Sequence, residues 1–416
     1  MIASIITIGD ELLIGQVVDT NSAWMARELN DNGIWLKRRV AVGDNKDDIV
    51  RTLAEESREA HIILITGGLG PTADDITKPV LCEFFGGKMV VNEAALANVK
   101  NILAKLTNRP VLERNLKQAE VPDVCTVINN KRGTAPGMWF EKDGKIFVSM
   151  PGVPHEMQGM MTDDVIPRLK RHFEMPFIRH RTLMVAGIGE SYVAEHIQSW
   201  ENQLPANIKL AYLPNYGMVR LRLTGIDDDE LIINNALDTQ FTQLKELVKE
   251  WLVTDKDQNM QQVVAEMLNK AGKTLGTAES CTGGYIAHIL TAAPGASSYF
   301  KGSIVSYSNA IKQGLLGVEE QTLNQHGAVS EETVTQMAKA ALSQLNTDYC
   351  VAVSGIMGPD GGSSEKPVGT VWVAAAGRNS ILTQKFHFRF NRARNIDLTA
   401  NFSLNLLRQL LLQEPD

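Results

Sequence analysis

The chain has 416 residues, which predicts roughly two to four domains with separate hydrophobic cores. Its net charge of −7 and its pI near 5.7 argue against binding to nucleic acid or to an anionic membrane, because both need a basic surface. The first residues lack a basic leader, and no run of about 18 apolar residues predicts a membrane span. Its four cysteines lie far apart without C-x-x-C spacing, so neither a disulfide framework nor a zinc finger is expected. We therefore expect a cytoplasmic protein that binds small molecules.

Residues 1–170 alternate apolar, β-rich runs with helical patterns. The expected strands are Ile5–Ile8, Leu36–Val42, His61–Thr66 and Lys145–Met150, and the expected helices are Asn21–Asn32 and Lys46–Glu59. This order predicts a mostly parallel sheet with helices on both faces, which is a three-layer α/β domain. Ligands of such sheets bind at the carboxyl ends of the strands.

Three loops at those strand ends carry residues suited to function: Gly9–Glu11, Thr66–Asp75 and Pro151–Met157. The glycines of Thr66–Asp75 could simply form a tight turn. The acidic pair at its end, Asp74 and Asp75, adds candidate ligands for a divalent cation that bridges phosphate oxygens. The loop matches neither a P-loop nor the G-x-G-x-x-G motif, so an ordinary ATPase or dehydrogenase is not supported.

Residues 171–255 predict a small α+β domain. Strands are expected at Arg181–Ala186, Ile208–Leu213 and Met218–Leu223, and helices at Glu190–Trp200 and Asp228–Trp251. This β-α-β-β-α order is compatible with a KH-like module. Between residues 172 and 252, however, seven Lys or Arg stand against eleven Asp or Glu, a net charge of −4, and the RNA-clamping G-x-x-G loop is missing. We therefore expect a spacer or dimerisation domain that does not bind nucleic acid.

Residues 256–416 predict a third domain, also α/β, in which the turn Thr277–Gly284 follows an expected strand, Lys273–Thr277. An apolar-faced helix is expected from Tyr285, so Ser280 would lie where free backbone N–H groups stabilise anions. A lone serine at such a place is commonly a helix cap. The neighbouring Cys281 is intrinsically the better nucleophile, although a cysteine just inside an apolar helix more often packs in a core.

Two later segments of this domain also carry polar residues. The strand expected at Ser303–Tyr307 precedes a helix with Asn309 as its cap, so Tyr307 and Lys312 can both reach one cleft. The buried strand Cys350–Ser354 leads into a glycine-rich loop that ends at residue 370, before the strand Val371–Ala376. A loop of that length with acid and base inside it indicates a binding role.

The front of the chain resembles the molybdopterin-binding-like domain of the CinA family (competence/damage-inducible protein A). The matching segments are Gly9–Gln16, Asp19–Asn21, Ala41–Asp44, Thr66–Asp75 with Thr77 and Lys78, Asn115–Ala119, Ala135–Met138 and Pro151–Met157. The resemblance implies an ADP-ribose pyrophosphatase that uses a divalent metal, Mg²⁺ or Co²⁺. The candidate metal ligands are Asp10, Asp74, Asp75 and Glu156, although family members commonly carry Thr at the position of Asp10. The residues expected to meet phosphates or ribose are Asn21, Gly67, Gly68, Lys78 and Lys117.

The last domain resembles the nicotinamide mononucleotide amidase domain that ends CinA proteins. The matching segments are Ala278–Gly284, Tyr307–Lys312, His326–Ser330 and Ser354–Thr370. The resemblance implies hydrolysis of the nicotinamide carboxamide to nicotinic acid mononucleotide and ammonia, with a Ser–Lys arrangement and no cofactor. It also implies a homodimer.

Within that arrangement, Ser280 is the expected nucleophile, Lys312 the general base and Tyr307 a hydrogen-bonding relay. The residues expected to bind substrate are Glu279, Thr282, Gly283, Gly284, Ser354, Gly355, Gly358 and Lys366. The N–H groups of Thr282–Gly284 would hold either the oxyanion or the 5′-phosphate. Two alternatives stand beside this hypothesis. Cys281 could be the nucleophile, with Lys312 or Glu279 as partner, or the whole chain could be a non-catalytic nucleotide- or pterin-binding protein that assembles in competence or the DNA-damage response.

Overall fold

The computed structural model of the chain describes residues 1–106, 112–215 and 217–414. The chain forms two compact units, one of Met1–Arg179 with Gly225–Ala236 and one of His180–Thr224 with Leu237–Asp416. No helix within the described ranges is both long enough and apolar enough to cross a membrane.

A six-stranded sheet forms the centre of the first unit. Its strands are β1 (Ile2–Ile8), β2 (Trp35–Val42), β3 (Ile62–Thr66), β6 (Thr126–Ile128), β7 (Gly137–Lys142) and β8 (Lys145–Met150), in the order β2-β1-β3-β8-β7-β6. The four strands from β2 to β8 pair in parallel, as the alternating pattern predicts. β7 and β6 add an antiparallel edge that the sequence analysis did not predict.

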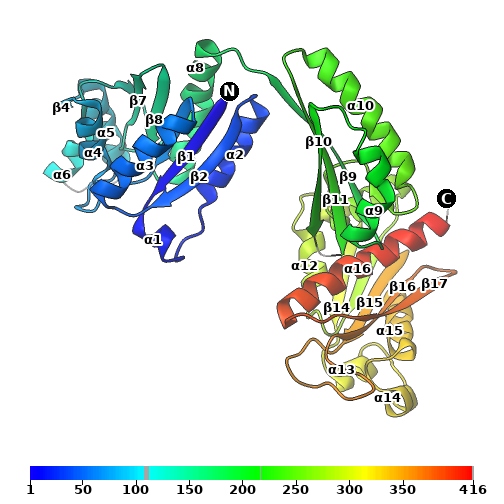
Figure 1. The fold of residues 1–416 in the computed structure, drawn as a ribbon. Coiled ribbons are helices and arrows are strands. Elements are labelled where there is room, and N and C mark those ends of the chain that lie inside the picture. The colour runs from blue at the N-terminus through cyan, green and yellow to red at the C-terminus, as the bar shows by residue number, and fades with distance from the viewer. Residues whose placement is uncertain (107–111, 216, 415–416) are drawn as a thin grey trace. The chain divides into compact units, whose positions relative to one another are not determined.

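Helices cover both faces of this sheet (Figure 1). One face carries α2 (Thr20–Asp31), α7 (Pro154–Met160), a π-helical segment (Met161–Val165) and α8 (Ile166–His172), and the other carries α3 (Lys46–Glu59) and α4 (Thr77–Phe85). Along β1, Ile5 packs in the core with Met25 of α2, whereas the next residue, Ile6, packs in the core with Leu53 of α3. Successive strand side chains point to opposite faces, so a strand buried on both faces must be apolar throughout. The expected three-layer α/β domain is confirmed.

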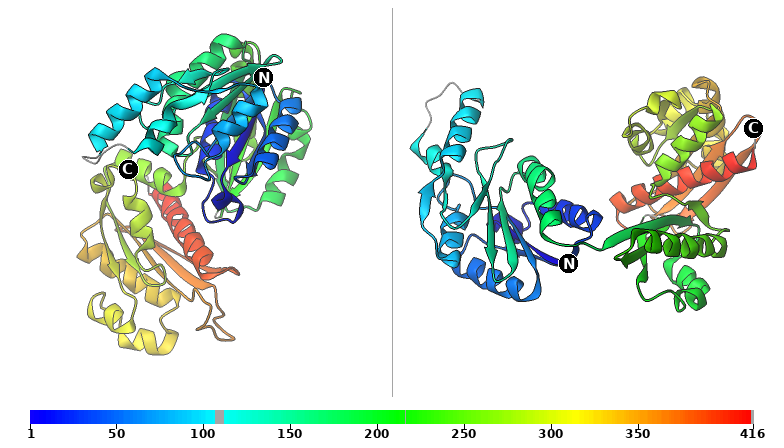
Figure 2. Two further views of the ribbon diagram at one scale, coloured as in Figure 1. Left: turned by 90° about the vertical axis from the view of Figure 1, so that its left-hand side faces the viewer. Right: turned by 90° about the horizontal axis from the view of Figure 1, so that it is seen from above.

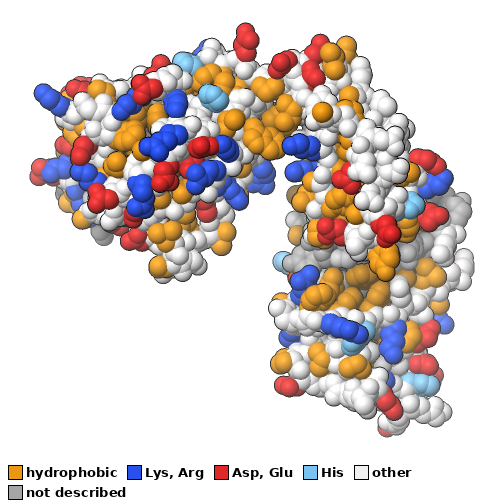
Figure 3. All heavy atoms as spheres, viewed as in Figure 1, with side chains coloured by type: hydrophobic (Ala, Val, Ile, Leu, Met, Phe, Trp, Pro, Cys, Tyr) orange, Lys and Arg blue, Asp and Glu red, His pale blue; other side chains and the backbone are white. Residues whose placement is uncertain are grey.

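The other elements of this domain lie outside the six-stranded sheet. They are α1 (Asp10–Leu13), β4 (Met89–Val91), α5 (Glu93–Leu106), α6 (Glu113–Leu116), a 3-10 turn (Lys117–Ala119) and β5 (Glu120–Pro122), which pairs antiparallel with β4. The face of this unit seen in Figure 3 interleaves basic and acidic side chains rather than gathering one sign of charge.

The KH-like module contains a four-stranded sheet and two helices. Its elements are β9 (Phe177–Ala186), α9 (Glu190–Glu201), β10 (Ile208–Asn215), β11 (Met218–Asp227), α10 (Glu230–Leu247) and β12 (Leu252–Thr254), with the sheet order β10-β11-β9-β12. The predicted β-α-β-β-α order is confirmed. The additional β12 pairs antiparallel with β9, and its three residues are too few to show a strand periodicity in the sequence.

The last domain is built on a five-stranded mixed sheet. Its strands are β13 (Leu275–Glu279), β14 (Phe300–Val305), β15 (Tyr349–Gly355), β16 (Thr370–Ala376) and β17 (Ile381–His387), in the order β14-β13-β15-β16-β17. β13 is parallel to both of its neighbours, and β15, β16 and β17 are antiparallel to one another. The sequence analysis gave no strand at Ile381–His387 and no sheet order.

Helices again cover both faces. They are α11 (Met260–Ala271), α12 (Tyr285–Thr291), a 3-10 turn (Ala296–Ser298), α13 (Asn309–Gly314), α14 (Glu320–His326), α15 (Glu331–Gln344) and α16 (Arg392–Gln413). α16 crosses one face of the sheet (Figure 1 and Figure 2) and shares its core with α11 and α12, through Leu404, Leu268 and Ile286. α15 packs on the opposite face, where Met337 meets Ala352 of β15.

Candidate active site

The turn after β13 is held in one conformation by its glycines and by the neighbouring strand. Gly283 and Gly284 have φ values of +62° and +98°, a region that side-chain-bearing residues rarely adopt. The N–H of Ser280 donates to the carbonyl of Val353 in β15 at 3.1 Å. Ser280 therefore lies at the carboxyl edge of the sheet, between the end of β13 and the start of α12.

Glu279 lies beneath this turn and organises it. Its side chain is fully buried, and its carboxylate accepts hydrogen bonds from the N–H groups of Gly284, Ile286 and Ala287 at 2.8–3.0 Å and from the Thr282 hydroxyl at 2.7 Å. A carboxylate in this position satisfies the free N–H groups of the first turn of α12 and interacts favourably with its dipole. The structure thus places Glu279 under the turn and away from solvent, and its predicted contact with substrate stays a prediction.

Ser280 and Lys312 meet in a buried pair. Lys312 Nζ lies 2.9 Å from Ser280 Oγ and donates to the carbonyl of Ser306 at 2.7 Å. The lysine is 1% exposed and the serine 7%. Burial lowers the pKa of Lys312, because the charged ammonium is poorly solvated there. A lysine with a lowered pKa next to a serine hydroxyl can act as a general base toward it.

The short helix α13 positions this lysine. Its N-cap is Ser308, whose hydroxyl accepts from the N–H of Ile311 at 3.3 Å, whereas the sequence analysis placed Asn309 at the cap. Serine and asparagine are both good N-cap residues. Ser308 is the cap because its backbone is extended, as a cap residue requires, whereas Asn309 is already helical. Lys312 then turns inward from the last part of the helix.

Cys281 is buried and packs in the hydrophobic core. It belongs to the same buried cluster as Ile286 and Val353. Burial raises the pKa of its thiol to about 12, so the reactive thiolate is scarce at neutral pH. These observations favour Ser280 over Cys281 as the nucleophile.

Tyr307 lies on the exposed side of the site, with 62% of its surface accessible. Its hydroxyl accepts a hydrogen bond from the guanidinium of Arg392 at 3.0 Å, and Arg392 also donates to the carbonyl of Gly358 at 2.9 Å. No hydrogen bond joins Tyr307 to Ser280 or Lys312 within the part of the chain that the structure describes, so its relay role stays a prediction. The sequence analysis missed Arg392, which lies outside the four matching segments of the last domain.

Some of the backbone N–H groups of the turn already donate hydrogen bonds within it. The N–H of Gly283 donates to the carbonyl of Ser280, and that of Gly284 donates to Glu279. Among the described residues, the N–H groups of Cys281 and Thr282 donate to no backbone carbonyl.

The glycine-rich loop after β15 is tied to the sheet and to α14. Ser354 donates through its hydroxyl to the carbonyl of Ala328 at 2.6 Å, and Lys366 Nζ donates to the carbonyl of His326 at 2.5 Å. A Cβ at Gly355 would lie 2.9 Å from the carbonyl oxygen of Thr370, so the backbone packs closely there. Ser354 and Lys366 therefore shape the loop, and Gly358 carries the carbonyl that holds Arg392.

In the first domain, the glycines of the loop after β3 serve close backbone packing. A Cβ at Gly67, where φ is +111°, would lie 2.1 Å from the carbonyl oxygen of Ile8, and one at Gly68 would lie 2.1 Å from the Thr77 hydroxyl. Asn21 joins this loop to the next one, because its amide donates to the carbonyl of Gly152 at 2.7 Å. Three loops at the carboxyl edge of the sheet are thus brought together, as predicted.

Lys78 lies next to this loop on α4. It is buried, and its Nζ donates to the carbonyl of Gln118 at 2.6 Å. Burial lowers its pKa to about 8. The exposed Lys117 precedes Gln118, so the structure brings the two predicted lysine segments together.

The four predicted metal ligands make separate sets of bonds. Asp10 accepts from the N–H of Asp44 at 3.2 Å, and Asp75 accepts from the N–H groups of Gly70 and Thr72 at 2.8 and 2.9 Å. Glu156 accepts from the amide of Asn130 at 2.6 Å, whereas Asp74 bonds with Thr72 and Ile76 of its own loop. Across residues 1–106, 112–215 and 217–414, no three His, Cys, Asp or Glu side chains gather closely enough to hold a metal ion. The four carboxylates therefore do not form one ligand set in this conformation.

Burial, together with the nearby Asp10, Glu11 and Asp74 carboxylates, raises the pKa of Asp44. The sequence analysis quoted Asp44 only as part of a matching segment. Two hydrogen bonds between backbone N–H groups and side-chain carboxylates join it to Asp10.

These domains define a class of multidomain α/β protein with a molybdopterin-binding-like domain, a KH-like module and a separate C-terminal α/β domain. The family model described as probable molybdopterin binding domain matches residues 4–171, the damage-inducible protein CinA KH domain matches residues 180–253, and the CinA C-terminal domain matches residues 257–411.

Curated relatives match the chain over almost its full length. A CinA-like protein of Cytophaga hutchinsonii is 44% identical over 98% of both chains, and one of Flavobacterium psychrophilum is 40% identical over 99% of both. A crystal structure of a competence/damage-inducible protein from Agrobacterium tumefaciens is 38% identical, covers 36% of this chain and 92% of its own, and has a TM-score of 0.35. The chain belongs to the CinA family.

Proposed function

We propose that the last domain hydrolyses the carboxamide of nicotinamide mononucleotide to nicotinic acid mononucleotide and ammonia. The observation that carries the proposal is the buried contact of 2.9 Å between Lys312 Nζ and Ser280 Oγ. A serine hydroxyl is a poor nucleophile until a base takes its proton, and a lysine whose pKa is lowered by burial can be that base. The family resemblance supplies the substrate.

The reaction proceeds in two halves that use the same pair. Ser280 Oγ attacks the carboxamide carbon while its proton passes to neutral Lys312 Nζ. When the tetrahedral intermediate collapses, the C–N bond breaks and Lys312 returns that proton to the nitrogen, which leaves as ammonia. Water then attacks the acyl-enzyme, gives one proton to Lys312, and the same proton restores the Ser280 hydroxyl as nicotinic acid mononucleotide departs. No cofactor takes part in these steps.

Two further groups are assigned to substrate binding. The N–H groups of Cys281 and Thr282 stabilise the oxyanion of the tetrahedral intermediate, because those of Gly283 and Gly284 already donate within the turn. Arg392, held by Tyr307 and Gly358, supplies a cation for the 5′-phosphate at the exposed rim. Glu279 positions the turn and does not touch substrate.

Release of ammonia from nicotinamide mononucleotide tests the assignment of the nucleophile. We expect Ser280→Ala to lower kcat by at least about 10³-fold, as loss of a serine nucleophile does in other hydrolases. Cys281→Ala, a neighbouring change in the same turn, is expected to keep kcat within about tenfold, because the thiol only packs in the core. Loss of turnover in the cysteine variant alone would show that the nucleophile is misassigned.

For the first domain we propose cleavage of the pyrophosphate of ADP-ribose, with a divalent metal as Lewis acid when it is bound. The observation that favours a phosphate-bearing ligand is Lys78, a buried cation beside the glycine turn Gly67–Gly68. The carboxylates Asp10, Asp74, Asp75 and Glu156 do not form a common ligand set, so no step through a metal is derived from them.

The alternative is a non-catalytic nucleotide- or pterin-binding protein. It is separated from the proposal by incubating the pure protein with nicotinamide mononucleotide and, separately, with ADP-ribose and Mg²⁺ or Co²⁺. Binding of both nucleotides without turnover of either would favour the binding protein. We propose a cytoplasmic homodimer that acts on these two nucleotides and on neither nucleic acid nor membranes.

A further inference from the structure

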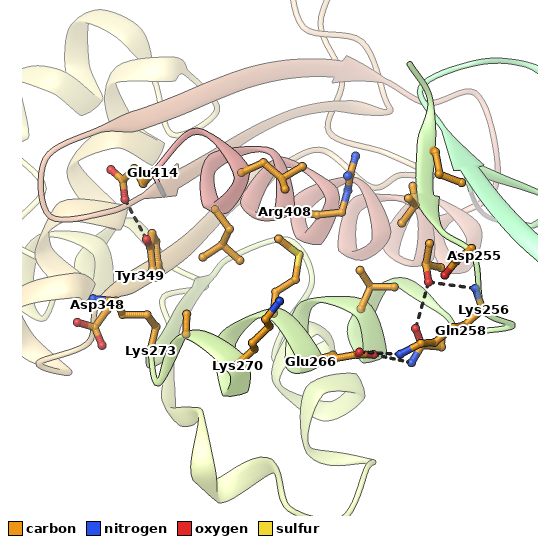
Figure 4. A pocket seen from close by; sticks show the side chains of 18 of the residues that line it. Asp255, Lys256, Gln258, Glu266, Lys270, Lys273, Asp348, Tyr349, Arg408 and Glu414 are labelled. Atoms are coloured by element: carbon orange, nitrogen blue, oxygen red, sulfur yellow. Dashed lines mark hydrogen bonds and ion pairs between the residues drawn. The ribbon is translucent and has the colours of Figure 1, made fainter. Parts of the chain in front are cut away.

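A cavity of about 1120 Å³ lies between the KH-like module and the last domain, inside one compact unit. Its wall is formed by the end of α10, by β12, by α11 and by the C-terminal part of α16 (Figure 4). Arg408 in this wall lies about 24 Å along α16 from Arg392, at a helical rise of about 1.5 Å per residue. The cavity is therefore separate from the candidate active site.

Much of the wall is apolar. Val253 of β12, Val263 and Met267 of α11, and Leu411 and Leu412 of α16 line it. Pockets for small organic ligands typically enclose about 300–1,000 Å³ and combine apolar walls with a few polar groups. The cavity has the size and the apolar surface to hold a body as large as a nucleotide.

The carboxylates of the wall are all engaged by other side chains. Asp255 pairs with Lys245 at 2.6 Å, Glu266 with Lys256 at 2.7 Å and Asp348 with Arg378 at 3.1 Å, and Glu414 accepts from the hydroxyls of Tyr349 and Ser380. These bonds leave the positive charges of the wall in excess.

Three cations of the wall, Lys270, Lys273 and Arg408, form no direct salt bridge with any residue that the structure describes, although Lys270 lies within electrostatic reach of Glu266 and Lys273 within reach of Asp348. Arg408 is half-buried, and its one hydrogen bond runs from Nε to the amide oxygen of Asn405 at 3.0 Å. A guanidinium stays protonated in proteins, and removing it from water without an anionic partner is unfavourable. Figure 4 shows Lys270 on α11 and Arg408 on α16, with apolar side chains between the two helices.

We propose that this cavity binds a small organic anion of about nucleotide size, with an apolar or aromatic body. The apolar or aromatic part of the ligand packs between α11 and α16. Its acidic group meets Lys270 of α11 and Arg408 of α16. Charge-assisted hydrogen bonds from Arg and Lys to such a group are shorter and stronger than neutral ones. An uncharged body of the same shape gains only the apolar contact.

Two probes with the same aromatic body separate these contributions in the full-length protein. 1-Anilinonaphthalene-8-sulfonate carries an anionic group, and N-phenyl-1-naphthylamine lacks it. We expect the sulfonate to bind at least about tenfold more tightly, measured by calorimetry and by fluorescence. Equal affinity of the two probes would overturn the proposal, because the cations would then contribute nothing.

Variants locate the binding site. Arg408→Met and, separately, Lys270→Met are expected to weaken binding of the sulfonate at least about tenfold, while Arg408→Lys keeps most of it. Lys339→Met, at an exposed position on α15 outside the cavity, is the matched control and should bind like the wild type. Circular dichroism melting establishes that each variant folds, and if Arg408→Met does not fold, Lys270→Met carries the test. Wild-type affinity in both cavity variants would place the sulfonate elsewhere and overturn the proposal.

Discussion

The turn Thr277–Gly284 and the loop Thr66–Asp75 both follow a buried parallel strand and both contain Thr-Gly-Gly, yet the fold uses their polar groups differently. In the turn, the carboxylate of Glu279 is buried and binds the first turn of α12, and Ser280 meets Lys312. In the loop, Asp75 bonds to its own loop, whereas Glu156 is bonded to Asn130.

The difference reflects what burial demands. A buried polar group must find its partner within the protein, so the chain alone fixes the geometry around Glu279 and Lys312. The carboxylates of the first domain's loops are half-buried or exposed and remain accessible to water, so a shared cation would be what brings them together. We therefore expect the Ser280–Lys312 site to be preassembled and the proposed phosphate site of the first domain to depend on its ligand.

Removal of divalent metal is expected to produce the largest difference between the two domains. EDTA should abolish cleavage of ADP-ribose, because the proposed reaction of the first domain needs a metal, and should leave deamidation of nicotinamide mononucleotide unchanged. Parallel assays of both substrates measure the effect, and added Mg²⁺ or Co²⁺ should restore the lost activity. Loss of both activities would contradict the metal-free serine mechanism, and loss of neither would contradict the metal dependence.

The next largest effect is expected from replacing Lys312, the proposed general base. Lys312→Met keeps the bulk of the side chain and removes its nitrogen, so kcat for ammonia release should fall about 10²–10⁴-fold. Lys339→Met, which removes a lysine from an exposed helix face, serves as the control and should keep the wild-type kcat. A Lys312→Met enzyme with full kcat at pH 7 would exclude the assigned role.

The pH dependence of the wild type sharpens this test. Only the neutral amine accepts a proton, so kcat/KM should rise with pH through the pKa of Lys312, which burial places below the ordinary lysine value. Between the folded and unfolded pKa values, the unfolded chain binds more protons than the folded one. The free energy of unfolding should therefore rise with pH relative to Lys312→Met. Equal slopes of stability against pH would show that the pKa of Lys312 is not lowered.

Much of the fold could be predicted because the periodicity of buried segments is strong. The strand Lys145–Met150 and the helix Lys46–Glu59 have the predicted bounds, since each is set by apolar spacing and, for the helix, by the cap Asn45. The short strands β4, β5 and β12 were missed, because three residues show no periodicity and their pairing is decided by distant segments.

The candidate site was predicted in its residues but not in its contacts. Ser280 and Lys312 were chosen by residue type and position, and the structure places them 2.9 Å apart. Arg392 was missed because it follows the last matching segment by 22 residues and reaches the site only through the packing of α16. The burial of Glu279 under the turn was not predicted, because local sequence does not reveal on which side of a strand end a carboxylate is buried.

The role assigned to Glu279 is tested by a change that keeps its shape. In Glu279→Gln, the amide NH₂ would face backbone N–H donors of α12, so at least one buried donor would lose its acceptor. We expect the free energy of unfolding to fall by about 2–4 kcal/mol, measured by urea denaturation followed by circular dichroism. Glu365→Gln, at an exposed position in the glycine-rich loop, is the matched control and should change it by less than about 0.5 kcal/mol. Equal stability of the two variants would mean that the turn holds Ser280 without this carboxylate, and the preassembly of the amidase site would then rest on Gly283, Gly284 and the bond to Val353.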